Sequence, residues 1–415
     1  MLNTSPANPG GRIFLSRALL AFVVVIFYCN IGIYLSLAVS SRLEPQYWLG
    51  LLVLLVIAWA VISPRYRFEV FRTPLFFWCV LFLGLTLIAY AVVPASDIST
   101  LKERIRDVVL LTSLLGVFLM MPDQIVFVRK LVFWAMVLGV LVNLISLVDS
   151  VFLLSGKFIP AQPAGLYINP NESATALILG MLLAIGVLAK TRRIPFVIWV
   201  FVGVAATFSR EAILGWVLVV MVLCILGTVN WKSLLLWISA LLAALVVIVL
   251  VLIKVDVLNV FVKQFYSMQL HRLVWFVDGI SSGSSADIRL KLLKDAWDLF
   301  LRHPWLGNGL GSTMQWQQAH STHNMYLYYM DDYGIVGALL YPLLVWCIVY
   351  GSRGETRKTA WCMAIFMLFW GLFDHNVVHN YYALFSISLM AAMSRISARA
   401  GSPEYAGSLG PVRTN

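Results

Sequence analysis

The sequence predicts an all-α integral membrane protein with about twelve transmembrane helices and a large, partly helical periplasmic loop between spans nine and ten. Of its 415 residues, 61% are hydrophobic and only 12% are charged, and the mean hydropathy is +0.88. Apolar runs recur at lengths near the ~20 residues that a spanning helix needs. Only helices and closed barrels satisfy their own backbone in lipid, and these runs have helix length. We therefore expect one polytopic membrane domain over 1–415, with the loop region 254–324 within it.

The individual spans follow from the apolar runs between charged segments. Several runs are shorter than the ~17 residues usually required, so their ends are loosely defined. The predicted spans are 18–39, 47–62, 74–93, 108–121, 131–154, 173–189, 194–208, 212–229, 233–253, 325–350, 359–373 and 381–394.

The distribution of Lys and Arg predicts the orientation of these spans. With the N-terminus inside, seventeen of the 30 basic residues lie on the inner side, six in short outer loops and seven in 254–324. Positive charge collects on the cytoplasmic side of short loops. Both termini are therefore expected in the cytoplasm, and the long loop outside it. The net charge of +11 forms no basic stripe, which argues against nucleic-acid binding.

Signals for cofactors and metals are missing from the sequence. The five cysteines lie inside apolar runs without paired spacing, so neither a disulfide nor a metal site is predicted. There is also no P-loop, Rossmann glycine set, DxD motif or nucleophile elbow. We expect no cofactor and no nucleotide-driven chemistry.

The long loop has internal structure of its own. Residues 257–276 mix aromatic and basic residues, as in a helix that lies at the membrane interface. A Ser-Ser-Gly-Ser-Ser break follows, and then a helix over about 286–302 that His303-Pro304 ends. Gly307, Gly309 and Gly311 predict a tight turn back toward the membrane. Before the sixth span, Asn169 is expected to cap a helix.

Arg210 lies at the outer end of a span, between two apolar runs. A charge at membrane depth is costly unless it is paired or faces water. It could pair with the adjacent Glu211 or extend to the interface. Alternatively it could bind an anion, because guanidinium recognises phosphate in a bidentate manner. We favour the anion ligand.

Other basic residues of the outer side are less distinctive. Arg289 and Lys291 lie on the loop helix, where basic residues are usually solvated, but two arginines facing one point could neutralise a diphosphate. Lys102, Arg104 and Arg106 could attract an anionic lipid or glycan. On a helix Lys102 and Arg106 share a face and Arg104 does not. For these three, a solvated face is the expectation.

His323 is the best candidate for a general base on the outer side. It opens the tenth span, where it could equally be a polar residue of a helix start. Histidine is the side chain that titrates near neutral pH. His320, His375 and His379 compete for the role. Asp374, in the last outer loop, could orient such a histidine as a carboxylate does in a catalytic triad, or could have no role.

The sequence resembles the O-antigen ligase family, within the superfamily that includes O-antigen polymerases and O-oligosaccharyltransferases. The resemblance covers the predicted topology and rests on His323-Asn324 followed, after nine residues, by Gly334-x-x-Gly337. Further matches to the family are Ser209-Arg210, Arg289 with Trp297, Pro304 with Gly307-x-Gly309, and Pro170-Asn171.

The resemblance implies an inverting, metal-independent glycosyltransferase of the bacterial inner membrane. It would transfer a glycan from a polyprenyl (undecaprenyl) diphosphate to a sugar hydroxyl of lipid A–core on the periplasmic face, in lipopolysaccharide biosynthesis. The implied catalytic residues are His323, Arg210, Arg289 and Asp374. Donor or acceptor binding is expected from Arg210, Arg289, Lys291, His303 and Asn324.

Three alternatives remain at the level of sequence. An O-antigen polymerase would use the same donor with a polyprenyl-linked acceptor, and a protein-directed oligosaccharyltransferase would usually carry an extra soluble domain. A lipid-linked glycan transporter would place its polar residues at mid-membrane on broken helices. Here they gather at span ends and on one loop.

Overall fold

The computed structural model is helical throughout the residues it describes, which are 9–40, 42–62, 68–148, 164–167, 169–254, 284–313 and 322–400. These residues contain no strand, which confirms the all-α prediction. Five helical segments are long and apolar enough to cross a membrane: Gly10–Tyr28, Pro45–Ile62, Pro74–Val92, Pro122–Ser146 and Met325–Val349. Twelve spans remain a prediction. The predicted interfacial helix over 257–276 lies outside the described residues, as does His320.

The chain forms two compact units, one of residues 1–134 with 296–415 and one of residues 135–295. The first unit contains α1 (Pro9–Val23), η1 (Val24–Tyr28), α2 (Ile31–Ala38), α3 (Pro45–Ile62), η3 (Val70–Arg72), α4 (Pro74–Val92), α5 (Ile98–Met120), η4 (Pro122–Gln124), α14 (Met325–Tyr333), η5 (Gly334–Val336), α15 (Gly337–Val349), α16 (Gly354–Trp370) and α17 (Tyr381–Ala400). The second contains α8 (Pro170–Ile185), α9 (Lys190–Ala206), α10 (Arg210–Ile225) and α11 (Trp231–Lys254). Two helices, α6 (Ile125–Val148) and α13 (Ser284–Phe300), contribute residues to both.

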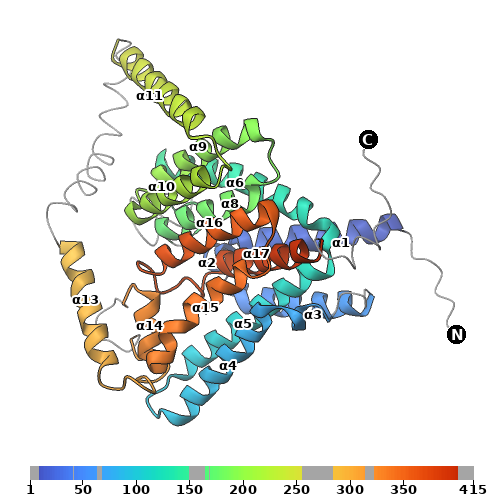
Figure 1. Cartoon of the computed structure of the whole chain (residues 1–415), viewed down its shortest axis with the longest axis vertical. Helices are drawn as coiled ribbons and strands as arrows, with labels where there is room; N and C mark the ends of the chain where they lie inside the picture. The colour runs from blue at the N-terminus through green and yellow to red at the C-terminus, as the bar shows by residue number, and fades with distance from the viewer. Residues whose placement is uncertain are drawn as a thin grey trace. The chain divides into compact units, whose positions relative to one another are not determined.

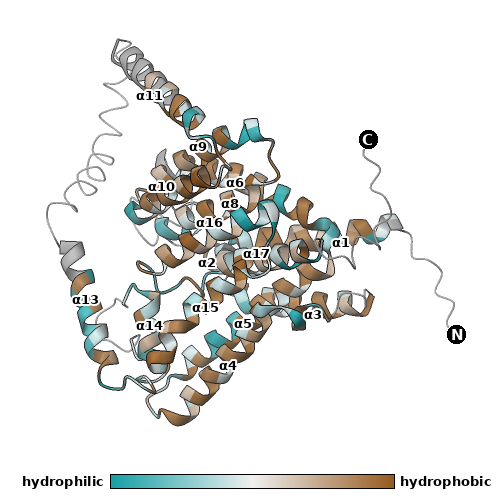
Figure 2. Ribbon diagram, in the orientation of Figure 1, coloured by the Kyte–Doolittle hydropathy of each residue, from teal (hydrophilic) through white to brown (hydrophobic). Residues whose placement is uncertain are grey.

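The core of the first unit is built by α4, α5, α15 and α17. The Phe118 and Phe385 rings meet edge-on at 5.3 Å, and the Ser388 hydroxyl donates to the Leu111 carbonyl at 3.1 Å, which joins α5 to α17. Trp78 donates to the Leu340 carbonyl at 2.8 Å, which joins α4 to α15. Figure 1 shows α4 and α5 running side by side (blue to teal), and Figure 2 shows α4 as mostly hydrophobic.

Side-chain caps define where several helices begin. The Thr73 hydroxyl accepts from the Phe76 amide at the start of α4, and Pro74 follows at the first helical position. Asp97 accepts from the Thr100 amide at 2.9 Å at the start of α5. Hydrogen bonds from the Ser99 hydroxyl and the Thr100 amide lower the pKa of Asp97 to about 2. The predicted cap at Asn169 is confirmed, since its Oδ1 accepts from the Glu172 amide at 2.9 Å.

The structure corrects two predicted spans. Helix α5 begins at Ile98 instead of 108, because the Asp97 cap starts a helix that continues through the charged residues. The span predicted over 18–39 is broken: a π-helical turn, Val24–Tyr28, is followed by Asn30 in the left-handed conformation (φ 59°). Hydropathy alone locates apolar runs but not caps or left-handed residues.

The second unit packs tightly around α9. A methyl group built on Gly203 would lie 2.7 Å from Val140 Cγ2 and 2.9 Å from Leu177 Cδ1, so α6 and α8 approach α9 closely there. Asn143 accepts from the Ser173 hydroxyl at 3.0 Å, which connects α6 to α8. The loop helix predicted over 286–302 is confirmed as α13, and its mixed hydropathy contrasts with α4 in Figure 2.

Candidate functional site

The start of α14 is tied to the segment between α16 and α17. Asn324 caps α14, accepting at its Oδ1 from the amides of Tyr326 and Leu327, both at 3.0 Å. The Met325 amide donates to the Gly371 carbonyl at 2.8 Å. His323, immediately before the cap, is half-buried with φ 49°. A non-glycine residue in this region of backbone space is uncommon and often marks a functional position.

His323 faces the segment that carries Asp374 and His375. The rings of His323 and His375 meet edge-on with centroids 5.6 Å apart. Asp374 accepts at Oδ2 from the Trp370 indole at 3.2 Å and at Oδ1 from the Asn376 amide at 2.8 Å. Both contacts fix its carboxylate beside His375, whose Nδ1 is 4.0 Å from Oδ1. The segments that carry His323, Asn324 and Asp374 are therefore neighbours in the first unit.

His375 is held neutral by its surroundings. It is 7% exposed, and burial lowers its pKa to about 3, with further contributions from the nearby His323, His379 and Arg104. Its Nδ1 is buried and makes no hydrogen bond to any residue in the described ranges. A group with so low a pKa takes up almost no protons near neutral pH, so His375 is a poor general base.

A buried ionic network lies behind this surface, on α5, α14 and residues 371–380. Arg104 is fully buried and its Nη2 contacts Asp332 Oδ2 at 3.1 Å. Its Nη1 contacts His379 Nε2, and the Nδ1 of His379 contacts Asp107 Oδ2 at 2.5 Å. The guanidinium also lies over the Tyr328 ring, 4.8 Å from its centroid. The expected solvated face for Arg104 is wrong: because the helix begins at Ile98, Arg104 points inward, where Asp332 compensates its charge.

The network fixes the tautomer of the His379 ring. Arginine only donates hydrogen bonds, so Nε2 of His379 must accept from Arg104. The ring proton is then on Nδ1, which donates to Asp107. Both ring nitrogens are occupied in the folded protein, which removes His379 as a competing general base.

Gly334 and Gly337, the two glycines of the pattern that begins at His323, allow neighbouring backbone segments to pack closely. Gly334 has φ 68°, and a side chain there would come within 2.5 Å of the Trp305 backbone. A methyl group on Gly337 would overlap the carbonyl oxygen of Tyr329. The segment that follows α13 packs against the chain around these glycines. The Ile335 amide donates to the Pro304 carbonyl at 2.7 Å, and the Asn308 amide donates to the Asp331 carbonyl at 2.7 Å. The predicted glycine turn is confirmed, with φ of 78°, 98° and 73° at Gly307, Gly309 and Gly311.

In the second unit, Arg289 pairs with the acid that follows Arg210 in the chain. Ser209 caps α10, accepting from the Ala212 amide at 3.3 Å, and Arg210 is the first residue of the helix. Its neighbour Glu211 contacts Arg289 of α13, with Nη1 to Oε2 at 3.3 Å. Arg289 remains 41% exposed, so Glu211 orients it without covering it. Glu211, the partner expected for Arg210, is in contact with Arg289.

Residues 195–341 match a family model described as O-antigen ligase. This segment of the chain is similar to the O-antigen ligase family. A comparison with curated proteins found no match. The matched segment includes Arg210, Arg289 and the span from His323 to Gly337. Together with the apolar helices, it identifies a membrane protein of the glycosyltransferase type, with a ligase- or polymerase-like function.

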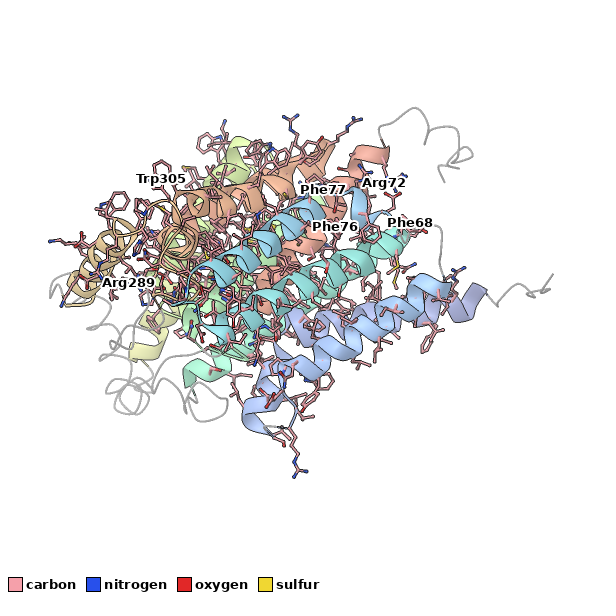
Figure 3. All side chains as sticks on the ribbon, turned by 90° about the horizontal axis from the view of Figure 1, so that it is seen from below. Phe68, Arg72, Phe76, Phe77, Arg289 and Trp305 are labelled. Carbon is pink, nitrogen blue, oxygen red and sulfur yellow. The ribbon has the colours of Figure 1, made fainter. Side chains whose placement is uncertain are left out.

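The predicted site residues fall into two sets. Arg289 pairs in the second unit with Glu211, the residue that follows Arg210, and the segments that carry His323, Asn324 and Asp374 are neighbours in the first. Lys291 and His303 have exposed side chains, and no contact with another predicted site residue is seen for them in the described part of the chain. Figure 3 shows the Arg289 side chain on α13.

Sequence analysis did not find the network of Arg104, Asp107, Asp332 and His379. A signal was available, because ionisable residues in apolar segments are rare and usually pair with one another. Asp331-Asp332 lies inside the apolar run 325–350, and Arg104 precedes another run by a few residues. Each of these residues needed a partner, but the sequence did not identify which.

Proposed function

We propose that this protein is an O-antigen ligase, which transfers a glycan from undecaprenyl diphosphate to a sugar hydroxyl of lipid A–core at the periplasmic face of the inner membrane. The reaction would be a single displacement with inversion, without a metal. The acceptor oxygen bonds to the anomeric carbon while the bond from that carbon to the diphosphate oxygen breaks. The acceptor proton goes to a base, and undecaprenyl diphosphate leaves.

The observation that carries the proposal is the state of the three described histidines around α14. His379 uses both ring nitrogens in the buried network, and burial suppresses proton uptake by His375. His323 is half-buried beside them. It is the histidine we assign as the general base that takes the acceptor proton.

Its neighbours suit that role. Since His375 is neutral near pH 7, it adds no positive charge against the proton that His323 gains. The Asp374 carboxylate, held by Trp370 and Asn376, supplies a fixed negative charge on the same segment. A carboxylate near a histidine stabilises the imidazolium that forms during proton transfer.

Arg210 and Arg289 are assigned to the diphosphate. The Arg289 guanidinium stays partly exposed although it pairs with Glu211, and the N-terminus of α10 adds a partial positive charge at Arg210. Diphosphate is already a good leaving group, so stabilising its developing charge is sufficient and no general acid is needed. Asn324, Lys291 and His303 are proposed to contact the glycan or the acceptor.

The test is transfer by purified protein in liposomes that contain undecaprenyl-diphosphate glycan and lipid A–core, with products separated on a gel. His323→Asn removes the imidazole but keeps a residue that tolerates the left-handed backbone. We expect a loss of transfer of ~10²–10⁴-fold, with Arg357→Gln, an exposed substitution on α16, unchanged.

Each other result has a defined meaning. Transfer by a folded His323→Asn protein within a few-fold of the parent would exclude His323 as the base. Lengthening of the polyprenyl-linked glycan without lipid A–core would assign the polymerase reaction, which the same family match supports. Movement of intact donor across the bilayer without any new glycosidic bond would indicate a transporter.

A further inference from the structure

A groove lies between α4, α15 and α17 of the first unit, apart from the candidate site residues. Its cavity volume is about 420 Å³. It lies where α4 begins and α15 ends, the end of α15 remote from α14 and His323. Two arginines, Arg72 and Arg395, line it together with apolar side chains. Figure 3 shows Arg72 and Phe77 near each other at the start of α4.

The walls of the groove are apolar stripes of two helices. On α4 the stripe is Pro74, Phe77, Trp78 and Leu81, and on α15 it is Leu343, Trp346, Cys347 and Tyr350. Both follow the i, i+3, i+4, i+7 spacing of one helix face. Phe77 and Trp346 remain 63% and 50% exposed, whereas Trp78 and Cys347 are buried and form the floor. Each stripe covers eight residues and is roughly 10 Å long, enough for part of an acyl chain.

The polar end of the groove carries excess positive charge. Glu69 pairs with Arg395 at 3.7 Å and with Arg72 at 3.9 Å, and it also contacts Arg399. One carboxylate therefore contacts three arginines. Among these four described side chains the net charge is +2. The Nε of Arg395 is buried and makes no hydrogen bond within the described residues. The side chain of Arg72 is 69% exposed, so a ligand at the protein surface can reach its guanidinium.

We propose that this groove binds an anionic phospholipid, with the phosphodiester between Arg72 and Arg395 and one acyl chain along α4 and α15. Guanidinium groups bind phosphate oxygens with paired hydrogen bonds. A membrane lipid is the occupant because the stripes lie on helices apolar enough to span the bilayer. The orientation predicted from Lys and Arg puts this end in the cytoplasmic leaflet, where basic clusters attract anionic lipid. An anionic head group is preferred to phosphatidylcholine, whose choline would add a third uncompensated cation.

The binding is measured on the full-length protein, purified in detergent and titrated with single lipids in native mass spectrometry. Palmitoyl-oleoyl phosphatidylglycerol is the probe, and phosphatidylcholine with the same chains is the comparison. We expect phosphatidylglycerol to bind at least tenfold more tightly. Arg72→Gln/Arg395→Gln should abolish that preference. The matched control, Lys130→Gln/Arg357→Gln, removes the same charge from two exposed positions outside the groove and should retain it.

A second variant guards against misfolding of the arginine pair, which contacts Glu69. Leu343→Trp fills the apolar part of the groove without altering charge, and it should weaken lipid binding about as much. Equal binding of both lipids, or unchanged phosphatidylglycerol binding in Leu343→Trp, would overturn the proposal. So would full displacement of the lipid by inorganic phosphate, because this would mean that the site recognises an ion only. Glycan transfer is not measured, so this test is independent of the proposed ligase activity.

Discussion

The strongest energetic prediction concerns Arg104→Met. Methionine resembles arginine in length but has no charge and no N–H groups. Arg104 and Asp332 have side-chain exposures of 1% and 0%, and their contact is 3.1 Å. Removing one partner of such a pair costs about 3–5 kcal/mol, because the other charge remains buried and uncompensated. Asp332 would keep the Gly311 amide at 2.9 Å, and His379 would lose the donor to its Nε2.

The comparison with Asp332→Asn separates lost charge pairing from lost packing. An asparagine removes the negative charge, so Arg104→Met should cost less in that background, with a coupling of about 0.5–3 kcal/mol. Asp331→Asn is the matched control. Asp331 is equally buried, yet within the described chain its carboxylate makes no hydrogen bond. Its replacement should therefore leave stability unchanged or raise it, since no paired charge is lost.

The assay is reversible unfolding in mixed micelles with increasing dodecyl sulfate, followed by circular dichroism. Elution as a single species in size-exclusion chromatography controls for aggregation. The reasoning would be refuted if Arg104→Met were as stable as the parent protein. It would also be refuted if the effects of Arg104→Met and Asp332→Asn simply added, because the two side chains would then not interact in the folded state.

Three further predictions follow from the same geometry. Folding lowers the pKa of His375 from 6.5 to about 3. As the pH falls, the unfolded chain therefore takes up a proton at this residue at a higher pH than the folded chain does. Stability should be unaffected above pH 6.5 and fall as the pH drops toward 3; His375→Phe should flatten this part of the stability–pH curve, and an unchanged slope would contradict the assignment. Gly337→Ala should prevent correct folding, seen as loss of monodisperse protein, because its methyl group would overlap the Tyr329 backbone; Gly84→Ala, with nothing within 4 Å, should be tolerated. Arg210→Lys should reduce glycan transfer about tenfold or more, since an ammonium replaces the guanidinium fork by a point charge, and wild-type transfer rates would exclude diphosphate binding by Arg210.

Much of the fold follows from local information. The apolar runs predicted helices, and the described residues are helical. Asn169 and the 307–311 glycines were read correctly, because caps and left-handed turns depend on one or two neighbouring residues. The errors occurred where local signals overrode hydropathy, as at Asp97, which starts α5 ten residues early, and Asn30, which breaks the first span.

The sequence predicted the residues of the candidate site, but not the environments of their side chains. His323 and Asp374 were identified from residue type and position, and the structure brings their segments together through Asn324 and Met325. His323 was ranked first from its position, but the sequence did not show what distinguishes it physically from His375 and His379. His375 and His379 differ from His323 through burial and hydrogen bonding, which depend on residues from other helices.

The sequence by itself determined the class of the protein, because transfer of apolar side chains into lipid depends on composition and run length. It also determined the similarity of residues 195–341 to the O-antigen ligase family, through residues spaced closely along the chain. Only the tertiary structure decided the partners of the buried charges. Arg104 meets Asp332 and His379 across 228 and 275 positions, and Coulomb attraction falls with distance in space, not along the chain. A charge in an apolar segment shows that a partner must exist, and folding selects which residue it is.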